Sequence, residues 1–413
     1  MSAPKAAKTD LASRWLGGSV VAASDESFGD KENLLTPGAA VFEPGRYGNR
    51  GEIVDGWETR RRRSPGHDWV IVRLGAPGVV TSVTVDTSFF TGNHPEQCAV
   101  HACGLEGYPG PDDLIGQAAE WIEIVPRSTL SGDCENVFAV TDPRRFTHVR
   151  LSVYPDGGVA RLRVLGQVVP DPRGLEDLTV DLLSQNLGGA AVASSDDYFS
   201  AAAALNRPGL ARSMGEGWET RRRRDAGNDF VLFRLGYAGR VRRLIVDTSY
   251  FRYNASESVA VYGSASSHLP PAGSPSWQPL LGRTCLQPDT RHEFAVSHAG
   301  RVSAIRLDAY PDGGLSRVRV IGSIDPAARR AAGYRWFNSL PTSHAMTVLV
   351  DAGLSAAVAA DIAGSRPLQE GWPGGAGSDL SRQIGAGASR AILAVLEGTD
   401  DHADVVDRNT RPT

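Results

Sequence analysis

Cysteine is scarce in this chain of 413 residues, and long apolar runs are missing. The four cysteines are Cys98, Cys103, Cys134 and Cys285, three of them in the first half of the chain. So small and uneven a set favours neither a disulfide framework nor a zinc site. No apolar stretch approaches the roughly 20 residues of a membrane-spanning helix, and residues 1–15 lack the apolar core of a signal peptide. We therefore expect a cytoplasmic protein that does not enter a membrane.

An excess of positive charge is missing as well. The chain has 43 Lys and Arg against 47 Asp and Glu, a formal net charge of −4. Because nucleic-acid-binding domains are usually net basic, we expect no nucleic-acid partner. The sequence also lacks the P-loop, the dinucleotide-binding glycine fingerprint, HExxH and GxSxG. Nucleotide, zinc-protease and serine-hydrolase chemistry are therefore disfavoured.

What the chain does contain is a duplication. The octamer GWETRRRR occurs at residues 56–63 and returns at residues 217–224, which is 161 positions later. At the same offset, VTVDTSFF (83–90) matches LIVDTSYF (244–251). A repeat period of domain size indicates tandem copies of one folding unit.

Within each copy the sequence reads as a series of short strands. Segments such as WVIVRL, HVRLSVY and ARLRVLG are rich in β-branched and aromatic residues and partly alternate between apolar and polar. Clusters of Gly, Pro, Asp and Asn separate them, and no long amphipathic helix interrupts either copy. We predict an all-β fold of two antiparallel β-sandwiches or jelly rolls. The first occupies residues 1–170 and the second residues 171–325.

Residues 326–413 differ from both copies. Ala and Leu recur there at helical spacing, with Ser or Thr before each run. GWPGGAGSD (371–379) predicts a flexible break between helical segments. We predict a small helical appendage. A segment of this size would struggle to form a full core alone, so its apolar faces should pack on the sandwiches or on another subunit.

The arginine run allows two interpretations. Alternate side chains of a strand face opposite sides, so one pair among Arg60 to Arg63 can face a site and grip a carboxylate with the planar guanidinium. In the alternative, Arg61 and Arg63 form salt bridges across the sandwich edge and Trp57 fills the core. Glu58 and Glu219 would then pair with the arginines that follow them.

Acidic residues and one histidine are the other candidates for chemistry. Asp86 and Asp247 interrupt apolar strands, where a buried carboxylate needs partners or a shifted pKa. Hydrogen bonds to the neighbouring Thr and Ser explain them equally well. His67 precedes Asp68 in the first copy, whereas the second copy has Asn228. That histidine is either a general acid or base or a loop residue without a role.

Allantoicases, the allantoate amidinohydrolases of purine breakdown, resemble this chain from about Arg14 to Gly322. The resemblance rests on GWETRRRRSPGHDWVIVRLG and VDTSFFTGNHPEQCAVHAC and includes the tandem layout. It implies two jelly-roll domains of the galactose-binding type and hydrolysis of allantoate to ureidoglycolate and urea. We expect a homo-oligomer that needs no cofactor. Stimulation by a divalent metal stays open, although the spacing of His and Asp does not require a metal.

The substrate implied by the resemblance suggests a role for each of these residues. Allantoate is a carboxylate whose α-carbon bears two ureido groups, so releasing urea means breaking a C–N bond and adding water. The first copy matches the family pattern more closely, and we place the site there, with an interface between copies left open. The candidates are Arg60 and Arg62 for the carboxylate, Asn93 for a ureido carbonyl, and Glu58, His67, Asp68 and Asp86 for proton transfer. Two other classes remain: a non-catalytic binding module and a pathway scaffold without activity.

The tail carries a resemblance of its own. FNSLPTSHAMTVLVDAGLSAAVAADIAGSRPL (337–368) is similar to the opening segment of the ureide-pathway decarboxylase that acts on the oxo-hydroxy-carboxy-ureidoimidazoline product of urate oxidation. The catalytic His-Pro pair of that family should follow, but no histidine occurs between His344 and His402. We therefore expect a relic or docking module without decarboxylase activity.

Overall fold

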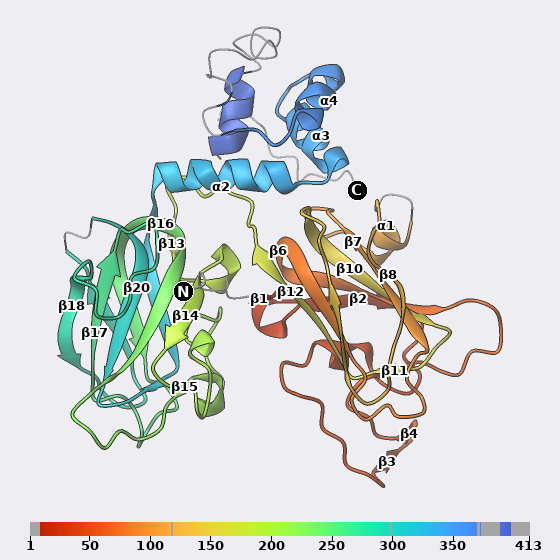
Figure 1. Ribbon diagram of the computed structural model, residues 1–413, viewed down its shortest axis with the longest axis horizontal. Coiled ribbons are helices and arrows are strands. Elements are labelled where there is room, and N and C mark those ends of the chain that lie inside the picture. The colour runs from red at the N-terminus through yellow and green to blue at the C-terminus, as the bar shows by residue number, and fades with distance from the viewer. Residues whose placement is uncertain (1–8, 117–118, 298–299, 370–371, 373–388, 398–413) are drawn as a thin grey trace, which may run out of the picture.

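The computed structural model describes residues 9–116, 119–297, 300–369, 372 and 389–397. Two β-sandwiches lie side by side, and helices from the end of the chain cross one end of the pair (Figure 1). None of the helices in these residues is long and apolar enough to span a membrane.

The first repeat is built on one eight-stranded antiparallel system. Its strand order is β1-β12-β6-β10-β7-β8, and β2 and β9 also pair with β6. Two short pairs, β5 with β11 and β3 with β4, lie at the loops. The strands are β1 (Thr9–Asp10), β2 (Ser19–Ala23), β3 (Tyr47–Gly48), β4 (Gly51–Glu52), β5 (Trp57–Glu58), β6 (Asp68–Asp86), β7 (Gln97–Cys103), β8 (Ile122–Thr129), β9 (Glu135–Ala139), β10 (Arg145–Tyr154), β11 (Gly158–Val159) and β12 (Arg161–Val168).

The second repeat has the same connectivity. Its order is β13-β22-β16-β20-β17-β18, with β14 and β19 on β16, and β15 pairs with β21. The predicted duplication and the all-β class are therefore confirmed. The strands are β13 (Thr179–Asp181), β14 (Ala190–Ser194), β15 (Trp218–Glu219), β16 (Asp229–Asp247), β17 (Ser258–Ser264), β18 (Gln278–Cys285), β19 (Arg291–Ala295), β20 (Arg301–Tyr310), β21 (Gly314–Leu315) and β22 (Arg317–Ile324).

One long strand joins the two layers of each sandwich. The first part of β6 pairs with β2 and β10, and its last part pairs with β9 and β12. The strand changes partners near Gly78, where a side chain would run into the carbonyl of Gln167. Gly239 of β16 meets the carbonyl of Ser323 in the same way. Glycine at this point lets the strand pass between layers without a clash.

The tryptophan of each octamer fills the core of its repeat. Trp57 and Trp218 are both fully buried. The indole N–H of Trp57 donates to the carbonyl of Asp25 at 2.7 Å, and that of Trp218 donates to the carbonyl of Asp196 at 2.9 Å. The interpretation of Trp57 as a core residue is confirmed, and the hydrogen bond satisfies the one polar atom of the ring.

The tail is helical, as predicted, and it forms a core of its own. Trp336 and Phe337 are the largest members of a buried cluster drawn mostly from the tail. The cluster also includes Val169, with Val79 of the first repeat packed against it, so the tail core is completed by residues outside the tail. The helices are α2 (Pro326–Ser339), α3 (Thr342–Asp351) and α4 (Ala356–Gly364), and residues 389–397 are also helical. Except for Trp372, the expected break at 371–379 lies outside the described residues.

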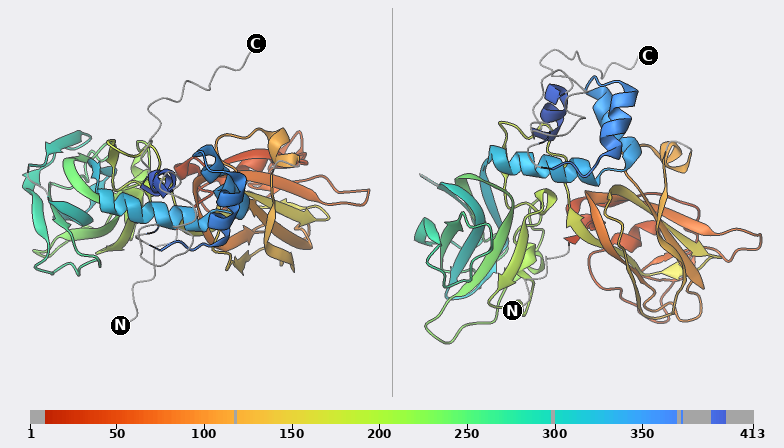
Figure 2. Two further views of the ribbon diagram at one scale, coloured as in Figure 1. Left: turned by 90° about the horizontal axis from the view of Figure 1, so that it is seen from above. Right: turned by 45° about the horizontal axis from the view of Figure 1, so that its top comes forward.

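The tail also touches both repeats. Helix α2 runs from the second sandwich towards the first (Figures 1 and 2). Its Ala332 packs into the core of the second repeat. Ser343 of α3 donates to Glu120 of the first repeat at 2.8 Å. The predicted packing of the tail on the sandwiches is therefore present alongside its own core.

Outside the tail the helical elements are short. They lie in the loops between strands and bring residues of these loops against the sheet edges. These elements are α1 (Pro111–Ile115) and the 3₁₀ turns η1 (Arg14–Leu16), η2 (Lys31–Leu35), η3 (Gln185–Leu187), η4 (Ala202–Ala204) and η5 (Met214–Glu216).

Replacing either octamer tryptophan should destabilise the repeat that contains it. We expect Trp57→Ala and Trp218→Ala each to lower the free energy of unfolding by about 3–5 kcal/mol, because each removes a fully buried aromatic ring. Urea denaturation followed by circular dichroism measures the loss. A loss below about 1 kcal/mol for either variant would contradict the assignment of that ring to the core.

Candidate active-site cavity

The arginine run does not lie in a strand. Strand β5 ends at Glu58, and residues 60–63 follow as irregular chain. The expectation that a strand would alternate these side chains was therefore wrong. Instead, aspartates from distant segments hold the backbone. The N–H of Arg60 donates to Asp25 at 2.7 Å, and the N–H of Arg62 donates to Asp156 at 2.6 Å.

The side chains of the same two arginines are also engaged. The Arg60 guanidinium pairs with Asp25, whose pKa is lowered by the hydrogen bonds and the positive charge of Arg60, which together outweigh its burial. The Arg62 guanidinium lies 3.5 Å from the buried carboxylate of Asp68. Arg60 and Arg62 therefore have internal acidic partners.

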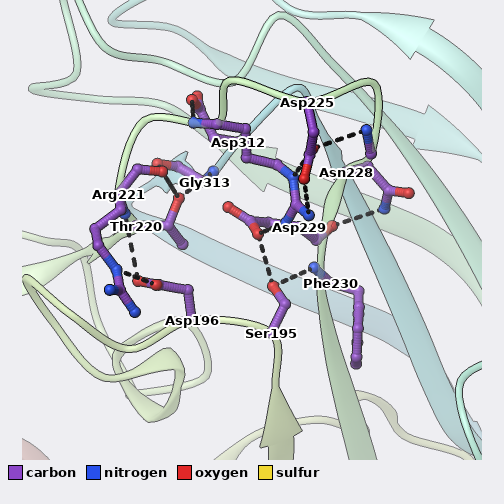
Figure 3. Close-up of polar contacts among 12 residues, drawn as sticks. Ser195, Asp196, Thr220, Arg221, Asp225, Asn228, Asp229, Phe230, Asp312 and Gly313 are labelled. Carbon is purple, nitrogen blue, oxygen red and sulfur yellow. Dashed lines mark hydrogen bonds and ion pairs between the residues drawn. The ribbon is translucent and has the colours of Figure 1, made fainter.

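The second repeat contains the same network (Figure 3). The Arg221 guanidinium contacts Asp196 at 2.8 Å. The backbone N–H of Arg223 donates to Asp312 at 2.9 Å, and its guanidinium contacts Asp229 at 2.6 Å. Because both copies retain these contacts, two arginines of each octamer have a structural role.

The other two arginines are left free. Arg61 and Arg63 are exposed, and neither forms an ion pair within the part of the chain that the structure describes. Arg222 and Arg224 are exposed in the same way. The salt bridges expected of Arg61 and Arg63 are thus not formed. The guanidinium groups without an acidic partner in the described residues are therefore those of Arg61 and Arg63.

A cavity of about 660 Å³ lies beside the arginine run of the first repeat, where β5 pairs with β11. It brings together three of the seven predicted residues, and it adds five charged or ionisable ones. Its polar lining includes Glu58, Arg60, Arg61, Arg63, Asn93, His94, Glu96 and Asp156. Such a mixture of guanidinium, amide and carboxylate groups can bind a small polar anion and exchange protons with it.

Glu58 and Asn93 form the polar pair in this cavity. The Asn93 side-chain amide donates to the Glu58 carboxylate at 2.8 Å. Burial raises the pKa of Glu58, and this hydrogen bond opposes the rise. The second repeat keeps the pair, with Asn254 donating to Glu219 at 2.7 Å. The expected ion pair between Glu58 and the arginines after it is absent from the described contacts.

Asp86 lies outside the cavity lining, at the end of β6. Its carboxylate accepts from the backbone N–H of Ser88 at 2.8 Å and from the Ser88 hydroxyl at 2.6 Å. Asp247 and Ser249 repeat both contacts at the same distances. The expected hydrogen bonds to the neighbouring serine are therefore present in both repeats, whereas the hydroxyls of Thr87 and Thr248 donate to backbone carbonyls.

His67 also lies outside the cavity lining. Its ring packs against Tyr154, with 4.7 Å between the ring centres. Burial lowers the pKa of His67, and the positive charges of Arg150 and Arg62 lower it further against the opposing charge of Asp68. The imidazole is therefore neutral at neutral pH and can accept a proton, but on the sheet face beside the cavity.

Sequence reasoning missed Arg61, Arg63 and His94 as cavity residues. The acidic partners were visible in the repeat, because Asp25, Asp68 and Asp156 each have an aspartate at the matching position of the second copy. These partners account for Arg60 and Arg62 and leave the other two arginines unpaired. No comparable signal marks His94, since the second copy has Ala255 there.

A metal would need several ligands close together. Over the described ranges, no three His, Cys, Asp or Glu side chains are arranged to hold one. The cysteines Cys98, Cys103, Cys134 and Cys285 are all free thiols.

Comparison with known proteins identifies relatives over both repeats. The allantoicase repeat family matches residues 9–169 and 180–325. A probable allantoicase of Nocardia farcinica is 46% identical over 317 residues, covering 76% of this chain and 94% of the relative. A probable allantoicase of Streptomyces coelicolor is 43% identical over 336 residues, covering 78% and 88%. The crystal structure of allantoicase from Saccharomyces cerevisiae matches with a TM-score of 0.66 and 34% identity, covering 76% of this chain and 93% of that one.

The raised pKa of Glu58 predicts a pH dependence of stability. Between the ordinary value of 4.5 and the raised value, the folded protein binds this proton more tightly than the unfolded chain does. Stability therefore falls as the pH rises through that window. We expect wild type to lose stability relative to Glu58→Gln as the pH increases above 4.5.

Urea denaturation of the two proteins across a pH series checks this expectation. Glutamine keeps the acceptor for Asn93, so the variant differs chiefly in lacking the titratable group. Parallel stability curves for the two proteins would contradict the raised pKa.

Proposed function

This chain belongs to the allantoicase family, and we propose that it hydrolyses allantoate to ureidoglycolate and urea in the cavity of its first repeat. The observation that carries the placement is that two arginines without acidic partners, Arg61 and Arg63, line the same cavity as Glu58 and Asn93. The substrate has one carboxylate and two planar ureido groups, and the cavity offers complementary groups for each.

The arginines bind the carboxylate of the substrate. A guanidinium presents two parallel N–H donors to a carboxylate, a geometry stronger than a single neutral hydrogen bond. Arg61 and Arg63 are free to do this, because the neighbouring arginines already hold Asp25 and Asp68. Each would gain a counter-ion on binding, which orients the α-carbon of the substrate in the cavity.

Asn93 holds the ureido group. One N–H of its amide is used by Glu58. An amide nitrogen has two hydrogens, so the second can donate to a ureido carbonyl. The amide then places this carbonyl beside the Glu58 carboxylate.

Glu58 transfers the protons. The reaction breaks the bond between the α-carbon and one ureido nitrogen and forms a bond from that carbon to the oxygen of water. Glu58 takes a proton from the water and returns it to the leaving nitrogen, so that urea departs neutral. Its raised pKa brings it closer to the working pH, where a group exchanges protons in both directions.

His94 is a second proton carrier in this scheme. Its Nδ1 lies 3.1 Å from the carbonyl of Thr91, which can only accept. This contact favours the tautomer with the proton on Nδ1, and it leaves Nε2 as an acceptor. Asp68 and Asp86 act as positioning residues, the first through Arg62 and the second through Ser88.

The scheme needs no cofactor, and we propose that the protein works without one. We also propose a cytoplasmic homo-oligomer. The four free thiols support a reducing compartment, since the exposed Cys285 would be oxidised readily elsewhere.

The matched glutamates of the two repeats test the placement of the site. Glu58→Gln should lower the rate of urea release about 10²-fold or more, because glutamine keeps the hydrogen bond from Asn93 but cannot carry a proton. Glu219→Gln makes the same change in the second repeat and should stay within a few-fold of wild type. The assay measures urea and ureidoglycolate from allantoate.

Two results would contradict the proposal. A larger loss in Glu219→Gln than in Glu58→Gln, with both proteins folded, would move the site to the second repeat. Wild-type protein that binds allantoate without releasing urea would be a binding module, and wild type that does neither would be a scaffold.

The tail should be dispensable for the reaction. We expect a protein ending at Ile324 to keep near-normal specific activity, because none of the tail residues that the structure describes lines the cavity. Its solubility or assembly should suffer, since Val169 and other buried residues of the interface become exposed. Size-exclusion chromatography and the urea assay measure both effects. A truncated protein that is folded, unchanged in oligomeric state and inactive would place the tail in the active site.

A further inference from the structure

Two arginines occupy matching positions in the repeats but differ in their partners. Arg150 of β10 pairs in register with Ile71 of β6, and Arg306 of β20 pairs with Leu232 of β16. The Arg306 guanidinium forms two bonds to Asp308, at 2.7 and 2.9 Å. In the first repeat the position of Asp308 is taken by Ser152.

Arg150 is consequently without a counter-ion. No carboxylate pairs with it in the described part of the chain, and its Nε atom is buried without an acceptor. Its guanidinium lies over the ring of Trp121, 4.9 Å from the ring centre. Burial lowers its pKa, and the groups that oppose this are the phenol of Tyr154 and the thiol of Cys103. Both are uncharged at neutral pH, because burial raises the pKa of Cys103 to about 12 and a tyrosine ordinarily titrates near pH 10.

The neighbouring strand adds a second unsatisfied group. His101 of β7 lies directly opposite Arg150, and its Nδ1 atom is buried without a partner. Glu123 of β8 is opposite His101 but is exposed and does not pair with Arg150. The second repeat has Tyr262 in place of His101, so it lacks this unpartnered ring nitrogen as well.

We propose that Arg150 and His101 form an anion-binding site on the outer sheet face of the first repeat, separate from the Glu58 cavity. The ligand is a small carboxylate that carries a planar amide or ring. Its carboxylate takes the place that Asp308 fills in the second repeat. Its planar part lies against Trp121, which is half-buried and therefore reachable from solvent.

The test uses oxamate, a stable carboxylate with a planar amide. Its binding is measured by calorimetry in the double variant R61Q/R63Q, which removes the free arginines of the cavity. In this background we expect saturable binding that Ser152→Asp weakens at least tenfold. An aspartate two residues along the strand points to the same side as Arg150 and supplies the internal partner. Asp308→Ser, the reciprocal change in the second repeat, should leave the oxamate affinity of the first repeat unchanged.

Arg150→Gln is the second variant, and it should abolish the same binding. It keeps the test decisive if Ser152→Asp fails to fold. A crystal structure of wild type with oxamate should place the carboxylate beside Arg150. The proposal would be overturned if neither Ser152→Asp nor Arg150→Gln reduced the binding of oxamate. So would the absence of saturable binding in R61Q/R63Q. Because no turnover is measured, these results are independent of allantoate hydrolysis.

Discussion

The pairing of Arg60 and Arg62 with aspartates from other segments governs the geometry of the chain between β5 and β6 in the first repeat. Asp68 is almost fully buried at the start of β6, and a carboxylate in that position requires a positive partner. Arg62 supplies it, while Asp156 holds the backbone of the same arginine. The chain between β5 and β6 is fixed as a result. Arg61 is then directed away from these aspartates, into the cavity.

Duplication lets one repeat serve as a physical reference for the other. Both copies preserve the aspartate contacts and the bond from asparagine to glutamate, so these features belong to the folding unit. Two differences concern polar groups. His94 has Ala255 as its counterpart, and Ser152 has Asp308. The first difference gives the first repeat an imidazole that the second repeat lacks. The second leaves an arginine of the first repeat without the acidic partner that Asp308 provides in the second repeat.

The sequence predicts the sandwiches well because the signals are local. Alternating apolar residues and repeated octamers determine where strands form, and the same pattern in both copies leaves little ambiguity. The arrangement of the arginines could not be read in this way. Their partner Asp25 lies 35 residues from Arg60, and Asp156 lies 94 residues from Arg62. The repeat marks these aspartates as matched positions, but only the folded chain shows that they hold Arg60 and Arg62.

The helical tail fixes the repeats from the end opposite the cavity. In Figure 1 the helices cross the top of the two sandwiches, whereas β11, which borders the cavity, lies near the bottom. Pro341 packs on Gly104 so closely that a side chain at Gly104 would have to displace it. Ala332 meanwhile enters the core of the second repeat. Contacts to both repeats oppose their separation. The aromatic core of the tail therefore stabilises the arrangement of the two sandwiches, while the described lining of the cavity comes from the first repeat.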